Sequence, residues 1–199
     1  MARWVTFDCY GTLVDWNAGL RGALGSEKLL ERYHEVEPQV QAEDPSLTYR
    51  EVMRETARRL GVDADPGESL PRWPVFAEVP AALAEARDRG WRLAILSNTD
   101  RDLLDASIDA IGVPFDLSIV ASEIGSYKPA ERHWRAFEEV TGGLPDVHVA
   151  QSLFHDIATA NALGIPNVWI NRLGEDAGDT SPTAERPDLT GLADVLDEL

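Results

Sequence analysis

Cysteine is scarce in this chain of 199 residues, and long apolar runs are absent. The single cysteine, Cys9, excludes an intramolecular disulfide. No segment approaches the roughly 18 consecutive apolar residues of a membrane-spanning helix, and the first residues read as a strand rather than a leader peptide. We therefore expect a soluble, unexported protein of the cytoplasm that has no membrane partner.

Positive charge is also in short supply, because 18 Lys and Arg residues face 35 Asp and Glu residues, for a net charge of −17. Such an acidic chain is repelled by nucleic acid and by anionic membranes, so neither is an expected partner. Only two of the 18 basic residues are lysines, Lys28 and Lys128. A lysine in a chain that otherwise uses arginine suggests a position at which arginine would not serve.

Apolar residues make up 44% of the chain, which is ordinary for a protein that buries a core. Apolar runs and segments of helical periodicity alternate from residue 79 onward. The patterns predict strands at 3–8, 92–96, 115–120, 147–150 and 167–170, helices at about 79–89, 100–110, 130–141, 156–163 and 189–199, and a polar loop at 174–187. Strands separated by helices of this length predict an α/β fold with a doubly wound, mainly parallel sheet.

Residues 15–61 have a different pattern, in which apolar side chains recur at three- and four-residue steps on two successive helices. The stretch 63–74 is rich in proline and predicts a linker out of this helical insertion. We therefore predict a core of residues 1–14 and 76–199, with 15–75 inserted after the first strand as a helical cap with its linker.

Polar side chains follow several of the predicted strands at the point where each strand ends. Each alone has a structural explanation as a turn, a helix cap or a solvated charge. Because parallel strands end at the same edge of a sheet, we expect these residues to lie together. Functional sites of such sheets form at that edge. The residues are Asp8 with Thr12, Ser97 with Asn98, Lys128, and Ser152 with Asp156.

This set resembles the four motifs of the haloacid dehalogenase-like hydrolase superfamily, over essentially the whole chain. The first motif is Asp-x-x-Gly-Thr after an apolar strand, and the others are a serine that closes a strand, a lysine followed by proline, and an acid before a helix. The matching residues are Asp8, Gly11 and Thr12, then Ser97, then Lys128 and Pro129, and finally Asp156. The resemblance implies a Rossmann-like core, with residues 15–75 in the position of the family's cap.

The resemblance implies that Asp8 is a nucleophile, since a carboxylate can form a covalent intermediate that divides one displacement into two steps. Lys128 would keep that carboxylate ionised and offset the charge of a small anionic substrate. Backbone amides after Asp8, at Cys9 and Tyr10, together with the hydroxyls of Thr12 and Ser97, would hold substrate oxygens. Asn98 would donate to a carboxylate or a departing halide, and Asp156 would hold Lys128 or the hydrolytic water. The Cys9 side chain itself is expected to pack away from the site, by strand alternation.

The residue types at two positions separate the branches of the superfamily. Its phosphatases carry a general acid two residues after the nucleophile, where this chain has Tyr10, and a further metal-binding acid where it has Gln151. Only Asp8 and Asp156 would remain for Mg²⁺, which prefers several hard oxygen ligands. The pattern therefore resembles the L-2-haloacid dehalogenase branch, which needs no cofactor.

The match to that branch is incomplete. Ser152 would replace in part a serine and an asparagine of the fourth motif, and Trp134 stands where the branch has a tyrosine, so it is expected to line the pocket. The branch also receives the halide on a cap arginine, for which Arg32 is the first choice and Arg50 and Arg54 are rivals. His148 is interpreted as a structural residue. The same interpretation is preferred for His155, although its place beside Asp156 leaves a role in the site open.

Three hypotheses remain open from the sequence. The leading one is a hydrolase that releases halide from short 2-haloalkanoic acids. The second is a small-molecule phosphatase with an atypical magnesium site made of Asp8 and Asp156, and the third is a non-catalytic binding protein on the same fold. A homodimer is compatible with each of them.

Overall fold

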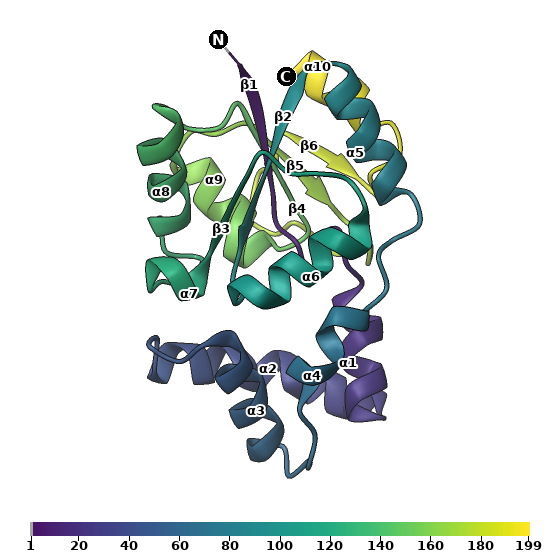
Figure 1. Cartoon of the computed structure of the whole chain (residues 1–199), viewed down its shortest axis with the longest axis vertical. Coiled ribbons are helices and arrows are strands. Elements are labelled where there is room, and N and C mark those ends of the chain that lie inside the picture. The colour runs from purple at the N-terminus through teal and green to yellow at the C-terminus, as the bar shows by residue number, and fades with distance from the viewer. Residues whose placement is uncertain (1) are drawn as a thin grey trace.

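The computed structural model describes residues 2–199 and contains a sheet of six parallel strands in the order β3-β2-β1-β4-β5-β6 (Figure 1). The strands are β1 (Arg3–Phe7), β2 (Trp91–Ser97), β3 (Leu117–Val120), β4 (Val147–Ala150), β5 (Asn167–Ile170) and β6 (Ala184–Arg186). The order reverses direction beside β1, which places its carboxyl end at the crevice where such sheets bind ligands. The predicted α/β class is confirmed.

Alternation along the central strands divides the core into two layers, because successive side chains of a strand point to opposite faces. On β2, Leu93 and Ile95 belong to the larger apolar cluster, whereas Ala94 and Leu96 belong to a second cluster. The larger cluster includes residues of α5 (Val79–Asp88), α6 (Arg101–Ile111) and α10 (Leu192–Glu198), and it continues into the helices between β1 and α5. The helices beside the other face are α7 (Ala121–Ile124), α8 (Arg132–Thr141) and α9 (Ala158–Ala162) (Figure 1).

A separate group of helices follows β1 and lies below the carboxyl ends of the strands in Figure 1. It consists of α1 (Trp16–Leu24), α2 (Glu27–Glu43), α3 (Tyr49–Arg59), α4 (Pro66–Ser69) and a 3₁₀ turn at Leu70–Arg72. Local chemistry sets two of the starts: the Asp15 side chain accepts the Ala18 N–H, and Thr48 and Glu51 form a capping box on α3. The chain enters and leaves this group side by side, at a bridge between Val14 and Val75.

Two segments that were expected to be irregular contain short regular elements. The expected linker 63–74 contains α4 and the 3₁₀ turn, and the expected loop 174–187 contains β6. Strand β6 has only three residues and no apolar alternation, and it exists because its backbone pairs with β5, with Val168 opposite Ala184. None of the helices described in residues 2–199 is both long enough and apolar enough to cross a membrane.

Candidate active site

Asp8 follows β1 directly and is 7% exposed, at the point where the chain turns away from the sheet. The turn depends on Gly11, which has a φ of +91°, a conformation that favours glycine. Its amide donates to the Val14 carbonyl at 2.8 Å, and the Leu13 amide donates to the Cys9 carbonyl at 2.8 Å. A Cβ at position 11 would also lie 3.3 Å from Oε1 of Gln151. This turn therefore holds the Asp8 carboxylate at the edge of the sheet.

Lys128 is almost completely buried, and its ammonium binds groups from three segments at the sheet edge. Its Nζ donates to Oδ1 of Asp8 at 2.8 Å, to Oδ1 of Asp156 at 2.6 Å and to the Leu96 carbonyl at 2.8 Å. A compact ammonium can direct three donors to three acceptors, whereas a planar guanidinium cannot converge on them in the same way. This geometry explains why the position carries one of the two lysines of the chain.

The charges of this cluster are strongly coupled. Burial, joined by the negative charge of Asp156, raises the pKa of Asp8, and the Lys128 ammonium opposes that rise. Although burial acts against ionisation of Asp156, the Lys128 ammonium holds the pKa of that carboxyl well below its usual range. Burial alone would lower the pKa of Lys128, but the two carboxylates raise it. The cluster is therefore one cation held between two acids rather than a single ion pair.

Two of the side chains that were predicted to contact the substrate instead hold Asp8 and Lys128 in position. The Thr12 hydroxyl donates to Oδ2 of Asp8 at 3.0 Å and accepts the Gln151 amide at 2.9 Å, and Thr12 does not line the pocket. The Asn98 side chain accepts the Lys128 amide at 2.6 Å and donates to the Lys128 carbonyl at 3.1 Å. The single O–H of Thr12 is used by Asp8, so Thr12 has no donor left for a substrate oxygen, contrary to expectation. Asn98 clamps the lysine backbone with one N–H and its carbonyl oxygen, and it lines the pocket with a second N–H that these bonds do not use.

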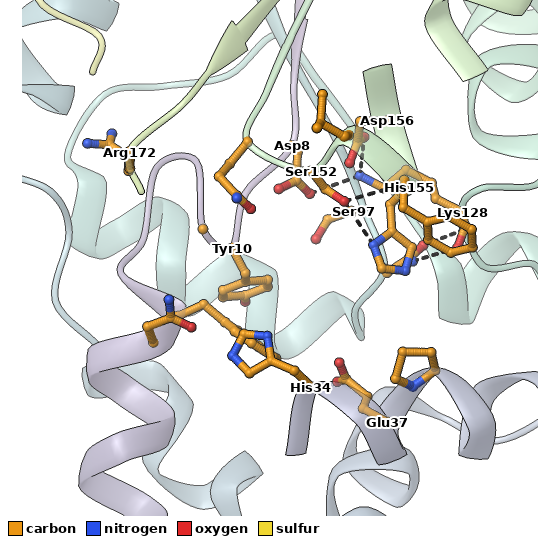
Figure 2. A pocket seen from close by; sticks show the side chains of 18 of the residues that line it. Asp8, Tyr10, His34, Glu37, Ser97, Lys128, Ser152, His155, Asp156 and Arg172 are labelled. Atoms are coloured by element: carbon orange, nitrogen blue, oxygen red, sulfur yellow. Dashed lines mark hydrogen bonds and ion pairs between the residues drawn. The ribbon is translucent and has the colours of Figure 1, made fainter. Parts of the chain in front are cut away.

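The Ser97 hydroxyl, unlike that of Thr12, is not engaged by the protein. Its Oγ is buried, lines the pocket and has no hydrogen-bond partner among the described residues. Oδ2 of Asp156 is likewise buried without a partner. Buried polar groups are nearly always hydrogen-bonded, so these two atoms are the ones that an incoming ligand or water would satisfy. They lie beside Asp8 and Lys128 on one side of the pocket (Figure 2).

Behind Asp156 lies a buried chain of hydrogen bonds that sequence reasoning missed. The Nε2 atom of His148 lies 3.0 Å from Oδ1 of Asp156, and the Thr6 hydroxyl lies 2.8 Å from Nδ1 of the same ring. Thr6 and His148 are register partners in β1 and β4, so the parallel pairing of the strands places them together. The only trace of this chain in the sequence is that each of two apolar strands has a polar residue among its apolar ones, Thr6 in the first and His148 in the other. In the structure, His148 holds the Asp156 carboxylate in position.

Tyr10 lines the pocket with its ring and turns its hydroxyl away from Asp8. The hydroxyl lies 3.0 Å from Oγ of Ser107 on α6, and the ring stacks on Tyr49 with centroids 6.5 Å apart. Burial raises the pKa of Tyr10 well above its ordinary value. This tyrosine is thus an anchored wall of the pocket, without the position or the acidity of a proton donor to a leaving group.

The pocket above Asp8 has a volume of about 610 Å³ and lies between the sheet edge and the helices α1 and α2 (Figure 2). Ser152 lines it and caps the following turn by accepting the His155 amide at 3.0 Å. His155 also lines it, which is the alternative that its place beside Asp156 had left open. The groups from α1 and α2 include Asn17, Arg21, His34 and Glu37.

Three predicted contributors lie elsewhere. Trp134 is completely buried in the core between α8 and the sheet, where its ring meets that of His148 edge-on at 5.4 Å, so it does not line the pocket. Arg32 is exposed on the far side of α2, because its neighbour Tyr33 takes the buried position. Cys9 is buried in the core and absent from the lining, as expected for its side chain.

The rival cap arginines also lie outside the pocket, since Arg50 pairs with Asp102 and Arg54 pairs with Asp65. The arginines that do line the pocket are Arg21 on α1 and Arg172 after β5. Arg21 Nη2 donates to Glu27 at 3.2 Å, and Arg172 donates to the Thr12 carbonyl at 2.8 Å and to Glu78 at 2.6 Å.

Comparisons with known proteins place the chain beside hydrolases of one family. A family model described as haloacid dehalogenase-like hydrolase matches residues 2–164. The (S)-2-haloacid dehalogenase of Pseudomonas sp. strain YL is 30% identical over 227 aligned residues, covering 97% of this chain and 94% of that protein. A phosphoserine phosphatase of Thermus thermophilus is 32% identical over 123 residues, with 59% of this chain and 49% of that protein covered.

Among solved structures, an L-2-haloacid dehalogenase from Xanthobacter autotrophicus with chloropropionic acid covalently bound has a TM-score of 0.79 and 23% identity. The match covers 100% of both chains. At this level of identity the likeness concerns the fold, including the helical group beside the sheet edge.

Proposed function

The chain belongs to the haloacid dehalogenase-like hydrolases, and on that premise we propose that it hydrolyses the carbon–halogen bond of 2-haloalkanoic acids through an ester on Asp8. The observation that carries the proposal is the arrangement around this carboxylate. Lys128 and Thr12 hold Asp8 in place, while the position two residues on offers an anchored tyrosine in place of an acid. A halide leaves without a proton, so this site has what carbon–halogen cleavage requires.

In the proposed reaction, a carboxylate oxygen of Asp8 attacks C2 of the substrate from the side opposite the halogen. The C–O bond forms as the carbon–halogen bond breaks, and the bonding pair leaves with the halide, so C2 is inverted. Water then adds to the carboxyl carbon of Asp8, and the bond between that carbon and the ester oxygen breaks, so the product keeps the oxygen that attacked C2. The water supplies one oxygen to the aspartate and one proton to the released 2-hydroxy acid, and the second proton goes to solvent.

The surrounding groups have roles in both steps. Lys128 offsets the negative charge of nucleophile and substrate, which would otherwise repel each other. The free hydroxyl of Ser97 is available to a substrate oxygen, and the free Oδ2 of Asp156 can orient the hydrolytic water. His148 and Thr6 hold Asp156 from behind, so that its geometry persists when the substrate enters.

The donor set does not fit the magnesium site of the phosphatase alternative. The two carboxylates that would share the ion, Asp8 and Asp156, both bind the Lys128 ammonium, and Gln151 replaces a further acid by a neutral amide. Within residues 2–199, the structure contains no group of three or more His, Cys, Asp or Glu side chains arranged to hold a metal ion. Magnesium prefers charged oxygen ligands, so we propose that the reaction is independent of a metal.

The test is release of chloride from (S)-2-chloropropionate in the presence of EDTA, with phosphate release from an aryl phosphate measured in parallel with and without Mg²⁺. The D8N variant should lose halide release, and the matched control D109N, which alters an exposed aspartate on α6, should retain it. Mass spectrometry of a reaction quenched within one turnover should find the ester on the peptide that contains Asp8. Absence of halide release across a panel of short 2-halo acids would refute the proposal.

A further inference from the structure

Glu37 is an acid on α2 that neither the sequence motifs nor the proposed reaction uses. It is 8% exposed, lines the pocket, and has an Oε1 atom without a hydrogen-bond partner. Figure 2 shows its carboxylate rising from the helix into the pocket, on the side opposite Asp8 and Lys128. The hydroxyls of Tyr49 and Tyr33 lie near this carboxyl, but no salt bridge to it is found among the described residues. A buried carboxylate without a cationic partner is costly, which makes it a group that a cationic ligand would stabilise.

The other charged groups of the pocket differ from Glu37 because they already have partners. Arg21 pairs with Glu27, and Arg172 pairs with Glu78. Asp15 caps α1, and the Glu175 carboxylate accepts from the Gln151 side chain. No cation of the protein is therefore directed at Glu37 among the described contacts, and Asp and Glu residues outnumber Lys and Arg residues along the lining.

The pocket has a second unpaired acceptor besides Glu37. Asn17 on α1 lines the same pocket, and its buried Oδ1 is also without a hydrogen-bond partner. Two unpaired acceptors on adjacent helices favour a ligand that brings hydrogen-bond donors. With an acidic wall and no protein cation nearby, the favoured donor is a positively charged one.

The volume of the pocket leaves room for such a group. At roughly 30 Å³ per heavy atom, the share of a water molecule in the liquid, 2-chloropropionate would occupy less than about 200 Å³. The pocket has about 610 Å³, within the range of pockets that hold much larger ligands. The space between Asp8 and Glu37 can accommodate a substrate longer than the shortest haloacids.

We propose that Glu37 binds an ammonium group at the far end of the substrate, so that the preferred 2-halo acid carries a terminal amino group. The inference rests on the proposed function, because it extends the same pocket. The carboxylate and halogen-bearing carbon lie at Lys128 and Asp8, and the ammonium reaches the Glu37 carboxylate. Glu37 thereby determines specificity and takes no part in the bond changes.

The test uses halogen-free ligands, so that binding is measured without the reaction. Calorimetry at pH 8 compares 4-aminobutanoate, 5-aminopentanoate and 6-aminohexanoate with pentanoate, hexanoate and heptanoate, which have the same numbers of heavy atoms. For the length that spans the pocket, we expect the amino acid to bind at least about 10-fold more tightly than its methyl counterpart, as for a hydrogen bond between charged groups.

Two variants assign that preference. E37Q should abolish it, and E35Q, which removes an exposed acid from the same helix, should leave it intact. Equal binding of every matched pair to the unmodified protein would overturn the inference, and so would a preference that survives E37Q. Halide release from 2-chloropropionate tests the proposed function separately, so either result can fail without the other.

Discussion

The buried carboxyl of Glu37 makes the stability of the protein depend on pH in a way that one substitution isolates. Burial raises the pKa of Glu37 from 4.5 to about 7, although the nearby hydroxyls of Tyr49 and Tyr33 oppose the shift. The folded state therefore holds this proton more tightly than the unfolded chain does. Its contribution to stability is fully present below pH 4.5 and is lost as the pH rises through about 7.

The magnitude follows from the two pKa values. At 1.36 kcal/mol per pKa unit, a shift from 4.5 to about 7 corresponds to about 3 kcal/mol of unfolding free energy at high pH. E37Q has no proton to lose and places a neutral amide at the same position. Its stability relative to the unmodified protein should therefore increase by about 2–3 kcal/mol between pH 5 and pH 8.

The groups that face Glu37 do not interfere in this window. They are Tyr33 on its own helix, Tyr49 on α3 and Tyr127 before α8, and burial raises the pKa of each above its ordinary value, so none ionises below pH 8. Burial lowers the pKa of His34, which lies in the same pocket, but its titration is common to both proteins and cancels.

The measurement is urea unfolding followed by tryptophan fluorescence at pH 5, 6, 7 and 8, with E35Q as the matched control on an exposed acid of α2. The difference in unfolding free energy between E35Q and the unmodified protein should stay nearly constant with pH. If the difference in unfolding free energy between E37Q and the unmodified protein were also constant from pH 5 to pH 8, the reasoning about burial would be refuted.

Three further substitutions test the placement of the site residues. K128R should reduce halide release by at least about 100-fold, because a guanidinium cannot bind the three acceptors around Nζ in the same way. Circular dichroism should show an intact fold, and near-normal activity would contradict that geometry. Y10F should keep most halide release and lose about 1 kcal/mol of stability in urea, since its hydroxyl bonds to Ser107 and not toward Asp8; loss of activity without loss of stability would give the hydroxyl a catalytic role. R32A should leave kcat/KM for 2-chloropropionate unchanged, because Arg32 is exposed and outside the pocket, and a large rise in KM would return it to the site.

Much of the catalytic end of the pocket could be predicted because its chemistry is local. Asp8 must lie at the sheet edge, since an apolar strand precedes it and a glycine in the left-handed conformation turns the chain directly after it. The same holds for Ser97, which closes β2. Parallel strands carry their carboxyl ends to one edge, so the order of strands and helices was enough to bring these groups together. Lys128 was identified by its scarcity and its motif, although only the fold shows that it joins two acids.

The other side of the pocket depended on tertiary packing. Whether Arg32, Tyr33 or Glu37 faces the substrate is decided by the rotation of α2 about its axis, which each helical residue changes by about 100°. Packing against the other helices of the insertion buries Tyr33 and Glu37, one turn apart, and turns Arg32 to solvent. For Trp134 the contact of α8 with the sheet determined burial. The sequence by itself therefore determined the position of the proposed nucleophile at the sheet edge and the hydrolase family, because both depend on local motifs at strand ends. The packing of helices decided which side chains line the rest of the pocket.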